Sequence, residues 1–276
     1  MRRDVLLITG ANGFLARAVV RQMYSDWQLA ALVRPGSLVP PHFHTAHESV
    51  EALIADLDHV DVVMHLAACI PSPLDSAPPE LIPVNVDLVA TLVRKYPFAR
   101  HVLASSVSVF GVPDSLPLSI DSPQRQPNAY GRSKLAAESL VRQMPKHAVI
   151  RFSSLIGYGM KTGSFIPTIV AAARAGEIRL FGNGERLQNY LDIDDAALMC
   201  LRAAISKKSF IALGTGERSY SNNEVADILA NLTGASIVRN GEDYSPSYVY
   251  EFSDSLDLGQ RRLTLEESLG KIVRRA

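Results

Sequence analysis

The strongest candidate for proton transfer is the segment Tyr130-Gly131-Arg132-Ser133-Lys134, which carries a phenol and an amine four residues apart. On a helix, this spacing places both side chains on one face, where they can act together. A free phenol has a pKa of about 10, and a donor that works near neutrality needs a pKa about 3 lower, which corresponds to about 4 kcal/mol. One ammonium about 4 Å away, at an effective dielectric constant of about 20, supplies roughly that amount. Tyr130 and Lys134 are therefore candidate catalytic residues, although the same spacing also occurs by chance on helix surfaces.

A group of hydroxyl side chains precedes this segment, at Ser105, Ser106 and Ser108. They follow an apolar run that predicts a strand over 101–105, so they lie at the carboxyl end of that strand. Ligands bind at this edge in open α/β sheets. Ser106 is therefore a candidate for polarising an oxygen beside Tyr130. The alternative is that these serines only cap the end of the strand.

A glycine-rich turn near the N-terminus, Gly10-Ala11-Asn12-Gly13-Phe14-Leu15-Ala16, lies between a predicted strand and a predicted helix. In such a turn the first glycine permits the tight bend, and the second lets the backbone approach a pyrophosphate at the helix N-terminus. An ordinary strand-turn-helix would show the same pattern. Its place at the first strand of an alternating chain favours a dinucleotide site. We expect the cofactor to contact Gly10, Asn12, Gly13, Phe14 and Leu15.

The second predicted strand ends in Val33-Arg34-Pro35-Gly36-Ser37, without the acidic residue that usually holds the ribose 2′-hydroxyl of NAD. A guanidinium with a nearby hydroxyl matches a 2′-phosphate in charge and geometry. Arg34 and Ser37 therefore indicate that NADP(H) is favoured over NAD(H). The alternative is that Arg34 is an ordinary solvated surface residue.

Short apolar runs alternate with helical patterns in the first part of the chain, which predicts an α/β fold. Strands are expected over 5–9, 29–33, 60–66, 101–105 and 148–152, with a helix over about 127–144. The expected architecture is a Rossmann-type doubly wound parallel sheet, because the strands are apolar on both faces.

After Gly159 the pattern changes to glycine-punctuated loops with predicted helices over 165–174, 193–204 and 222–232. We expect a smaller, interleaved C-terminal lobe that binds substrate. Residues 1–158, with 187–215 returning to them, would form the dinucleotide-binding domain. Residues 159–186 and 216–276 would form the substrate-binding lobe.

The composition excludes several classes of function. Hydrophobic residues make up 47% of the chain and charged residues 20%, which suits a buried core. Lys+Arg and Asp+Glu both number 28, so the overall charge favours neither a nucleic acid nor a membrane surface as partner. The two cysteines form no disulfide or zinc pattern, and His42, His44 and His47 lack the other ligands of a metal site. We expect a cytoplasmic, soluble protein without a structural metal.

The order of these motifs resembles the NAD(P)-dependent epimerase/dehydratase family of extended short-chain dehydrogenases/reductases, which includes nucleotide-sugar 4-ketoreductases and epimerases. The resemblance is carried by the segments 9–16, 65–68, 85–86, 105–111, 130–138, 151–159, 181–195 and 214–216. It implies catalytic roles for Ser106, Tyr130 and Lys134. It further implies cofactor contacts from Leu66, Ala67, Ala68, Asn85, Ser105, Tyr130, Lys134, Phe152 and Ser153. The implied substrate contacts are Ser72, Ser106, Ser108, Ser154 and Gln188.

Two departures from the family pattern narrow the expected reaction. The Asp-Glu pair that dehydratases carry after the catalytic hydroxyl is replaced by Val107 and Ser108, which argues against a 4,6-dehydratase. Relatives that bind a nucleotide-sugar pyrophosphate often have an arginine where this chain has Gln188.

The sequence therefore predicts an oxidoreductase, with Tyr130 as the proton donor during NADP(H)-dependent reduction of a ketone, favouring a nucleotide-linked 4-keto sugar. An NAD-dependent nucleotide-sugar epimerase is the first alternative. A non-catalytic protein that senses NAD(P) is the second, although sensing requires no proton donor. We also expect a homodimer, because the helix that carries Tyr130 presents Leu135, Leu140, Val141 and Met144 for packing.

Overall fold

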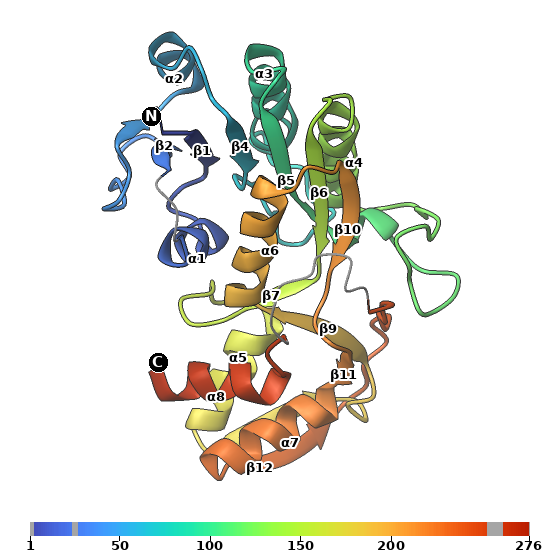
Figure 1. The fold of residues 1–276 in the computed structure, drawn as a ribbon. Helices are drawn as coiled ribbons and strands as arrows, with labels where there is room; N and C mark the ends of the chain where they lie inside the picture. The colour runs from blue at the N-terminus through green and yellow to red at the C-terminus, as the bar shows by residue number, and fades with distance from the viewer. Residues whose placement is uncertain (1–2, 24–26, 253–261, 276) are drawn as a thin grey trace.

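The computed structural model describes residues 3–23, 27–252 and 262–275. Their larger half is built on a seven-stranded sheet in the order β3-β2-β1-β4-β5-β6-β10, drawn in the upper part of Figure 1. Every neighbouring pair of these strands is parallel. The strands are β1 (Val5–Thr9), β2 (Gln28–Leu32), β3 (Thr45–His47), β4 (Val62–His65), β5 (Arg100–Ser106), β6 (His147–Phe152) and β10 (Phe210–Gly214). The predicted doubly wound α/β fold is confirmed.

Helices cover both faces of this sheet. The first face packs against α1 (Phe14–Arg21) and α6 (Ile193–Ile205), and the second against α2 (Val50–Asp56), α3 (Leu88–Lys95) and α4 (Ala129–Val141). Side chains alternate between the faces: Leu6 and Ile8 pack in the core with α1 and α6, whereas Val5 and Leu7 pack in the core with α2 and α3. Burial on both faces explains the continuously apolar strands in the sequence.

The smaller half contains two small sheets and three helices. The sheets are β7 (Ser154–Ile156), β9 (Leu187–Asp192) and β11 (Ser219–Ser221), and β8 (Glu177–Phe181) with β12 (Ser236–Asn240). The helices are α5 (Phe165–Arg174), α7 (Asn222–Thr233) and α8 (Leu265–Arg275), which share a second hydrophobic core. The helices predicted over 165–174, 193–204 and 222–232 are confirmed. No described helix is long and apolar enough to cross a bilayer.

The strand order reverses between β1 and β4, since the chain moves from β1 to β2 and β3 and then crosses back to β4. In doubly wound sheets, the crevice at the carboxyl ends of such strands is where ligands bind. The glycine-rich turn follows β1, and the serine group ends β5. The topology therefore brings both predicted motifs to one edge of the sheet.

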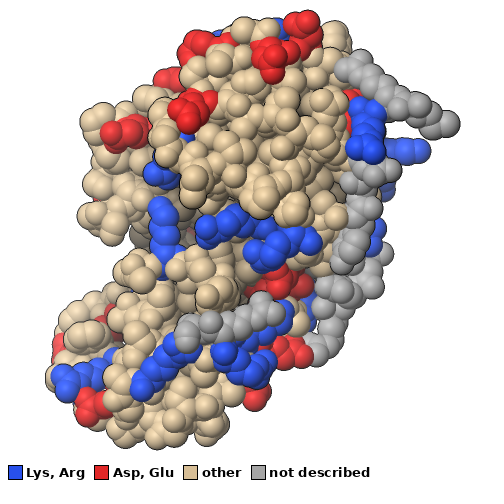
Figure 2. Space-filling view, turned by 90° about the vertical axis from the view of Figure 1, so that its left-hand side faces the viewer, with Lys and Arg blue, Asp and Glu red and all other residues tan. Residues whose placement is uncertain are grey.

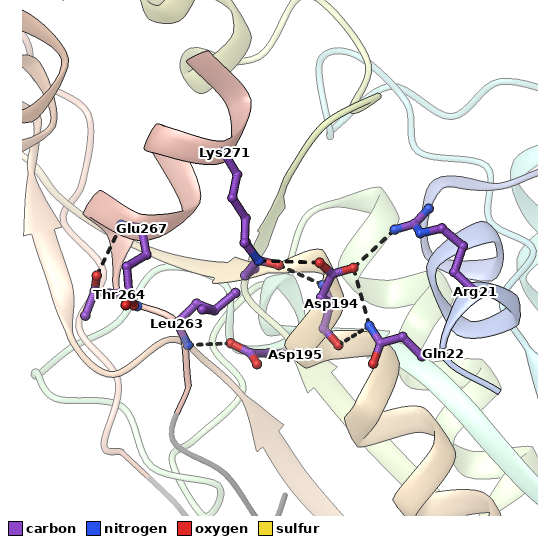
Figure 3. Close-up of polar contacts among 9 residues, drawn as sticks. Arg21, Gln22, Asp194, Asp195, Leu263, Thr264, Glu267 and Lys271 are labelled. Atoms are coloured by element: carbon purple, nitrogen blue, oxygen red, sulfur yellow. Dashed lines mark hydrogen bonds and ion pairs between the residues drawn. The ribbon is translucent and has the colours of Figure 1, made fainter. Parts of the chain in front are cut away.

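A carboxylate at the start of α6 joins the two halves, as Figure 3 shows. Asp194 Oδ1 lies 3.1 Å from Arg21 Nη2 and accepts a hydrogen bond from Gln22 Nε2 at 3.3 Å. Lys271 Nζ, from α8, lies 3.5 Å from Asp194 Oδ2. Figure 2 shows Lys and Arg side chains gathered at the waist between the two halves. Asp194 thus links the helix after the glycine-rich turn to the last helix of the smaller half.

Candidate active site

Helix α4 fixes the predicted phenol and amine at the sheet edge. The helix begins at Ala129, and the side chain of its N-cap Asn128 accepts a hydrogen bond from Gly131 N at 2.8 Å. The Tyr130 ring is 7% exposed, and Lys134 Nζ lies 5.8 Å from its centroid. The two side chains therefore share one face of α4, as their spacing predicts.

Lys134 is buried and held by the neighbouring strand. Its Nζ donates a hydrogen bond to the carbonyl oxygen of Ala104 at 2.9 Å, and the residue is 2% exposed. Burial lowers the pKa of Lys134 from 10.5 to about 8, and the negative charge of Glu138 opposes this shift. The side chain is therefore an ammonium at neutral pH that can lose its proton in mildly basic solution.

The pKa of Tyr130 is raised above its usual value, contrary to the lowering by Lys134 that the spacing predicts. Burial is the largest cause, since it disfavours the phenolate, and a hydrogen bond with Ser106 partly offsets it. The physical reason for the correction is desolvation: the single ammonium of Lys134 does not compensate for the loss of water around the phenol. Burial thus favours the neutral phenol of Tyr130 over the phenolate in this structure.

Ser106 ends β5 and begins the short 3-10 helix η2 (Val107–Phe110) as its N-cap. Its Oγ accepts a hydrogen bond from Ser108 N and donates one to Ser108 Oγ, both at 3.1 Å. Together with the Ser106 contact to Tyr130, this places the three predicted catalytic side chains next to one another.

The glycine-rich turn has the close approach that a dinucleotide site requires. Gly10 has a φ of +65°, and a Cβ at this position would lie 2.7 Å from Ala67 Cα. Thr9 Oγ1 holds the facing segment by accepting hydrogen bonds from Leu66 N and Ala67 N, each at 3.1 Å. A side chain at Gly10 would push these segments apart.

Polar groups without protein partners show that these residues fit an NAD(P) cofactor. The N-cap of α1 is Gly13, so no side chain caps the first amides of this described helix, which face Asn12 and the turn. Ser153 is 7% exposed, and its Oγ has no hydrogen-bond partner among the described residues. It follows Phe152 at the end of β6, and its backbone amide donates to Gly214 O at 2.9 Å. The pyrophosphate of the cofactor would accept hydrogen bonds from the first amides of α1, and the carboxamide of the nicotinamide ring would bond Ser153 Oγ.

Arg34 lies at the adenosine end of the expected site. Gly10 N donates a hydrogen bond to Leu32 O at 2.9 Å, so the second strand ends directly beside the glycine-rich turn. Arg34 follows two residues later with an exposed side chain, and Ser37 N closes the turn onto Arg34 O at 3.1 Å. The position suits contact with the adenosine ribose.

Two of the predicted cofactor residues use their side chains within the protein. Asn85 Oδ1 accepts from Cys69 N, while its Nδ2 donates to Cys69 O and to Ser133 Oγ. Ser105 Oγ donates to Glu138 Oε1 at 2.6 Å. These side chains therefore position the loop after β4 and the end of β5, and contact of Asn85 or Ser105 with a cofactor stays a prediction.

The predicted substrate residues are less tightly grouped. Ser108 lies beside Ser106, whereas Ser72 is exposed in the loop after β4 and Ser154 is exposed at the first position of β7. Gln188 donates from Nε2 to Asn222 Oδ1 at 3.1 Å, so its amide is directed to the start of α7. Substrate contacts from these residues stay a prediction.

His65, which the apolar strand around it predicts to be a core histidine, is buried and forms a pair with His101 that the sequence did not indicate. His65 Nε2 lies 2.9 Å from His101 Nδ1, and His101 Nε2 lies 2.9 Å from the carbonyl oxygen of Tyr96. A carbonyl only accepts, so His101 carries its proton on Nε2 and accepts one from His65. Burial, His101 and Lys134 together hold the pKa of His65 well below its usual value. Within the described ranges, no group of His, Cys, Asp and Glu side chains could hold a metal ion.

Comparisons with known proteins agree with this geometry. The family model described as the NAD dependent epimerase/dehydratase family matches residues 6–212. A putative UDP-glucose 4-epimerase of Methanocaldococcus jannaschii is 25% identical over 83% of both chains. The solved structure of MoeE5 with UDP-glucuronic acid and NAD is 26% identical, covers 98% of both chains and has a TM-score of 0.83.

A UDP-glucose 4-epimerase of Thermotoga maritima, solved with UDP-glucose, has the same fold, with a TM-score of 0.84 at 19% identity over 98% of this chain and 97% of that one. The family match covers most of the chain and includes Ser106, Tyr130 and Lys134. It therefore supports the enzymatic interpretation of the motifs over a sensing protein. The chain belongs to the NAD dependent epimerase/dehydratase family and is an oxidoreductase of the extended short-chain dehydrogenase/reductase type.

Proposed function

We propose that this enzyme is a nucleotide-sugar 4-epimerase that uses a bound NAD(P). The observation that carries the proposal is the grouping of Ser106, Tyr130 and Lys134 beside the glycine-rich turn, at one edge of the sheet. The putative UDP-glucose 4-epimerase and the complex of MoeE5 with a UDP-sugar and NAD support the choice of substrate class.

In this proposal the protein supplies binding and proton transfer. The turn at Gly10 and Gly13 would hold the pyrophosphate of the cofactor, and Ser153 would contact the nicotinamide end. A bound nicotinamide supplies the acceptance and return of a hydride. In the oxidation step Tyr130, as the phenolate, would take the proton of the sugar hydroxyl, and in the reduction step the resulting phenol would return it; Ser106 Oγ would donate a hydrogen bond to the same sugar oxygen. The Lys134 ammonium would favour the phenolate form of Tyr130 from which the cycle starts.

The two residues that follow Ser106 argue against a dehydratase, which eliminates water from its substrate. A dehydratase needs an additional acid and base there, and this position holds Val107 and Ser108. Val107 is apolar, and Ser108 is hydrogen-bonded to Ser106 through both its amide and its hydroxyl. A hydroxyl with its ordinary pKa is a poor replacement for a carboxylate as general base.

The proposal is tested by comparing the amount of cofactor consumed with the amount of sugar converted. We expect purified enzyme to release NAD or NADP on denaturation, and to interconvert UDP-glucose and UDP-galactose without net change in absorbance at the wavelength of reduced cofactor. Sugar products are measured by chromatography of the nucleotide sugars. In a parallel assay with a nucleotide-linked 4-keto sugar and NADPH, consumption of one NADPH for each sugar reduced, without interconversion of UDP-glucose and UDP-galactose, would replace the epimerase by a ketoreductase.

An NADPH-dependent reductase of a nucleotide-linked 4-keto sugar is the second candidate, and Arg34 favours it. The described residues after β2 include no carboxylate before Glu48 to hold a ribose 2′-hydroxyl. A 2′-phosphate would match the exposed guanidinium of Arg34. A reductase exchanges its cofactor in every turnover, so it would consume one NADPH for each molecule of 4-keto sugar supplied and would leave UDP-glucose and UDP-galactose unchanged.

We further propose a homodimer through the outer surface of α3 and α4. A groove there is lined by Ala90, Arg94, Leu140 and Met144, among others. The expectation included Val141, but that side chain is fully buried in the chain's own core, because it faces the sheet. Light scattering at micromolar concentration should give twice the mass of one chain, and a single-chain mass would remove the proposal.

A further inference from the structure

A buried ion pair lies one helical turn behind Lys134. Arg151 Nε and Nη2 donate to the two carboxylate oxygens of Glu138, at 3.0 Å and 2.9 Å. The side chains of Arg151 and Glu138 are 4% and 2% exposed. Ser105 Oγ donates to the same carboxylate at 2.6 Å. One carboxylate therefore accepts hydrogen bonds from both β5 and β6.

The ion pair of Glu138 and Arg151, together with Ser105, connects α4 to β5 and β6 at one position along the strands. Tyr130, Lys134 and Glu138 follow one another at intervals of four residues, so they share one face of α4. Ser105 and Arg151 are direct partners in the register of β5 and β6. The Glu138 carboxylate thus anchors the face of α4 that carries the catalytic pair, and a shift of the helix along the sheet would break these bonds.

Burying two charged side chains costs desolvation free energy, and apolar side chains could fill the same space without that cost. A buried ion pair seldom stabilises a fold more than apolar side chains of the same volume would. The guanidinium has further protein partners: Arg151 Nη1 donates to Ile120 O at 3.2 Å, and its carbon lies 5.0 Å from the centroid of the Phe110 ring. A pair this completely bonded, and this close to Lys134, indicates a role in the chemistry of the site.

The charged and titratable groups around Lys134 come from three elements. Tyr130 and Glu138 are on its own helix, His65 faces it from β4, and Arg151 lies behind Glu138 on β6. His65 stays neutral because its pKa is held low. Glu138 is the group whose charge raises the pKa of Lys134 against the effect of burial.

We propose that Glu138 is a positioning residue for the catalytic pair: held by Arg151 and Ser105, it fixes α4 on the sheet and places a negative charge one helical turn from the Lys134 ammonium. This inference rests on the roles of Tyr130 and Lys134 in the proposed function.

Three variants separate the effect of the Glu138 charge from the effect of the shape of its side chain. Glu138→Gln removes the charge and keeps the shape, whereas Glu138→Asp keeps the charge and shortens the side chain. Because Glu138→Gln leaves Arg151 buried without an anion, it could prevent folding. The double variant Glu138→Gln with Arg151→Gln leaves no unpaired cation. Glu177→Gln is the matched control, since it removes the carboxylate of an exposed pair with Arg179.

The direct measurement is an NMR titration of Lys134 in enzyme labelled with ¹³C at the lysine Cε, with the signal assigned by its loss in Lys134→Arg. Removing a negative charge favours loss of the proton, so Lys134 should titrate at lower pH in Glu138→Gln. In the double variant the loss of the Arg151 charge acts in the opposite direction but from behind Glu138, so the shift should have the same sign and be smaller. Even at a dielectric constant of about 80, a charge about 6 Å away moves a pKa by about 0.5. The titration should be unchanged in Glu177→Gln and Glu138→Asp.

Turnover supplies the second readout. The basic limb of the kcat profile should move to lower pH in Glu138→Gln by the same amount as the NMR titration. Glu138→Asp should lower kcat while leaving the position of that limb unchanged, because the charge stays and the helix shifts.

Lys134 titrating within about 0.2 pH units of wild type in Glu138→Gln, or at higher pH than wild type in the double variant, would overturn the inference. A shift in Glu138→Asp as large as in Glu138→Gln would overturn it too, since the charge would then not be the cause. If the NMR titration shifts as expected but the wild-type enzyme converts no nucleotide sugar, the proposed function fails and the effect of Glu138 on Lys134 stands.

Discussion

Tyr130→Phe is expected to lower kcat by about 100-fold or more, the usual contribution of general acid–base catalysis, while cofactor affinity changes by only a few fold. The ring would still fill its buried position next to Leu81 and Ala129, but the transferable proton would be gone. Steady-state kinetics with UDP-glucose gives kcat, and titration of intrinsic fluorescence with NAD and NADP gives the two dissociation constants.

Tyr244→Phe provides the matched control, because this tyrosine is 87% exposed in the smaller half and its loss of a hydroxyl should leave kcat unchanged. Retention of more than about a tenth of the wild-type kcat in Tyr130→Phe would show that another group transfers the proton. A parallel loss of cofactor binding would instead indicate damage to the site.

Arg34→Asp should reverse any preference for NADPH over NADH. A charge-assisted contact to a 2′-phosphate contributes about 1.5 to 3 kcal/mol, or about 10- to 150-fold in affinity. A carboxylate there would also repel the phosphate and could accept hydrogen bonds from the ribose hydroxyls of NADH. Dissociation constants for both reduced cofactors, measured by fluorescence at fixed ionic strength, give the ratio directly.

Arg142→Asp makes the same charge change at an exposed arginine just after α4, so it controls for the altered net charge. Equal affinities for the two cofactors in wild type, unchanged in Arg34→Asp, would show that Arg34 is a solvated surface residue. This result concerns the cofactor alone, because both an epimerase and a reductase can use either dinucleotide.

Five strands of the central sheet, β1, β2, β4, β5 and β6, could be predicted from sequence because they are largely buried on both faces, whereas β3 and β10 at its two edges were not predicted. Runs such as Val62-Val63-Met64 contain no polar residue, and the glycine-rich turn marks the end of the first strand. The small sheet of β7, β9 and β11 was not predicted either, since β7 and β11 have only three residues each, which is too little alternation to recognise. Their pairing depends on contacts between segments distant in sequence.

The catalytic group could be predicted because Tyr130 and Lys134 are close in sequence and Ser106 follows a recognisable strand. The pair of Glu138 and Arg151 was missed, although Arg151 interrupts an otherwise apolar strand. A charged residue at such a position needs a buried partner, and that signal could have been used. The identity of the partner depends on how α4 lies on β6, which the sequence pattern does not specify. Desolvation likewise made the pKa of Tyr130 unpredictable from spacing alone.

The junction at Asp194 has a thermodynamic consequence for the two ligands. Helix α1 is a rigid rod of eight residues, about 12 Å long, with the cofactor turn at one end and Arg21 and Gln22 at the other. A rotation of the smaller half moves Lys271, whose contact with Asp194 adjoins the contacts of Asp194 with Arg21 and Gln22, and therefore acts on the far end of this helix. Linkage between two binding sites is reciprocal. If a bound sugar raises the affinity for the cofactor by some factor through this junction, the bound cofactor raises the affinity for the sugar by the same factor.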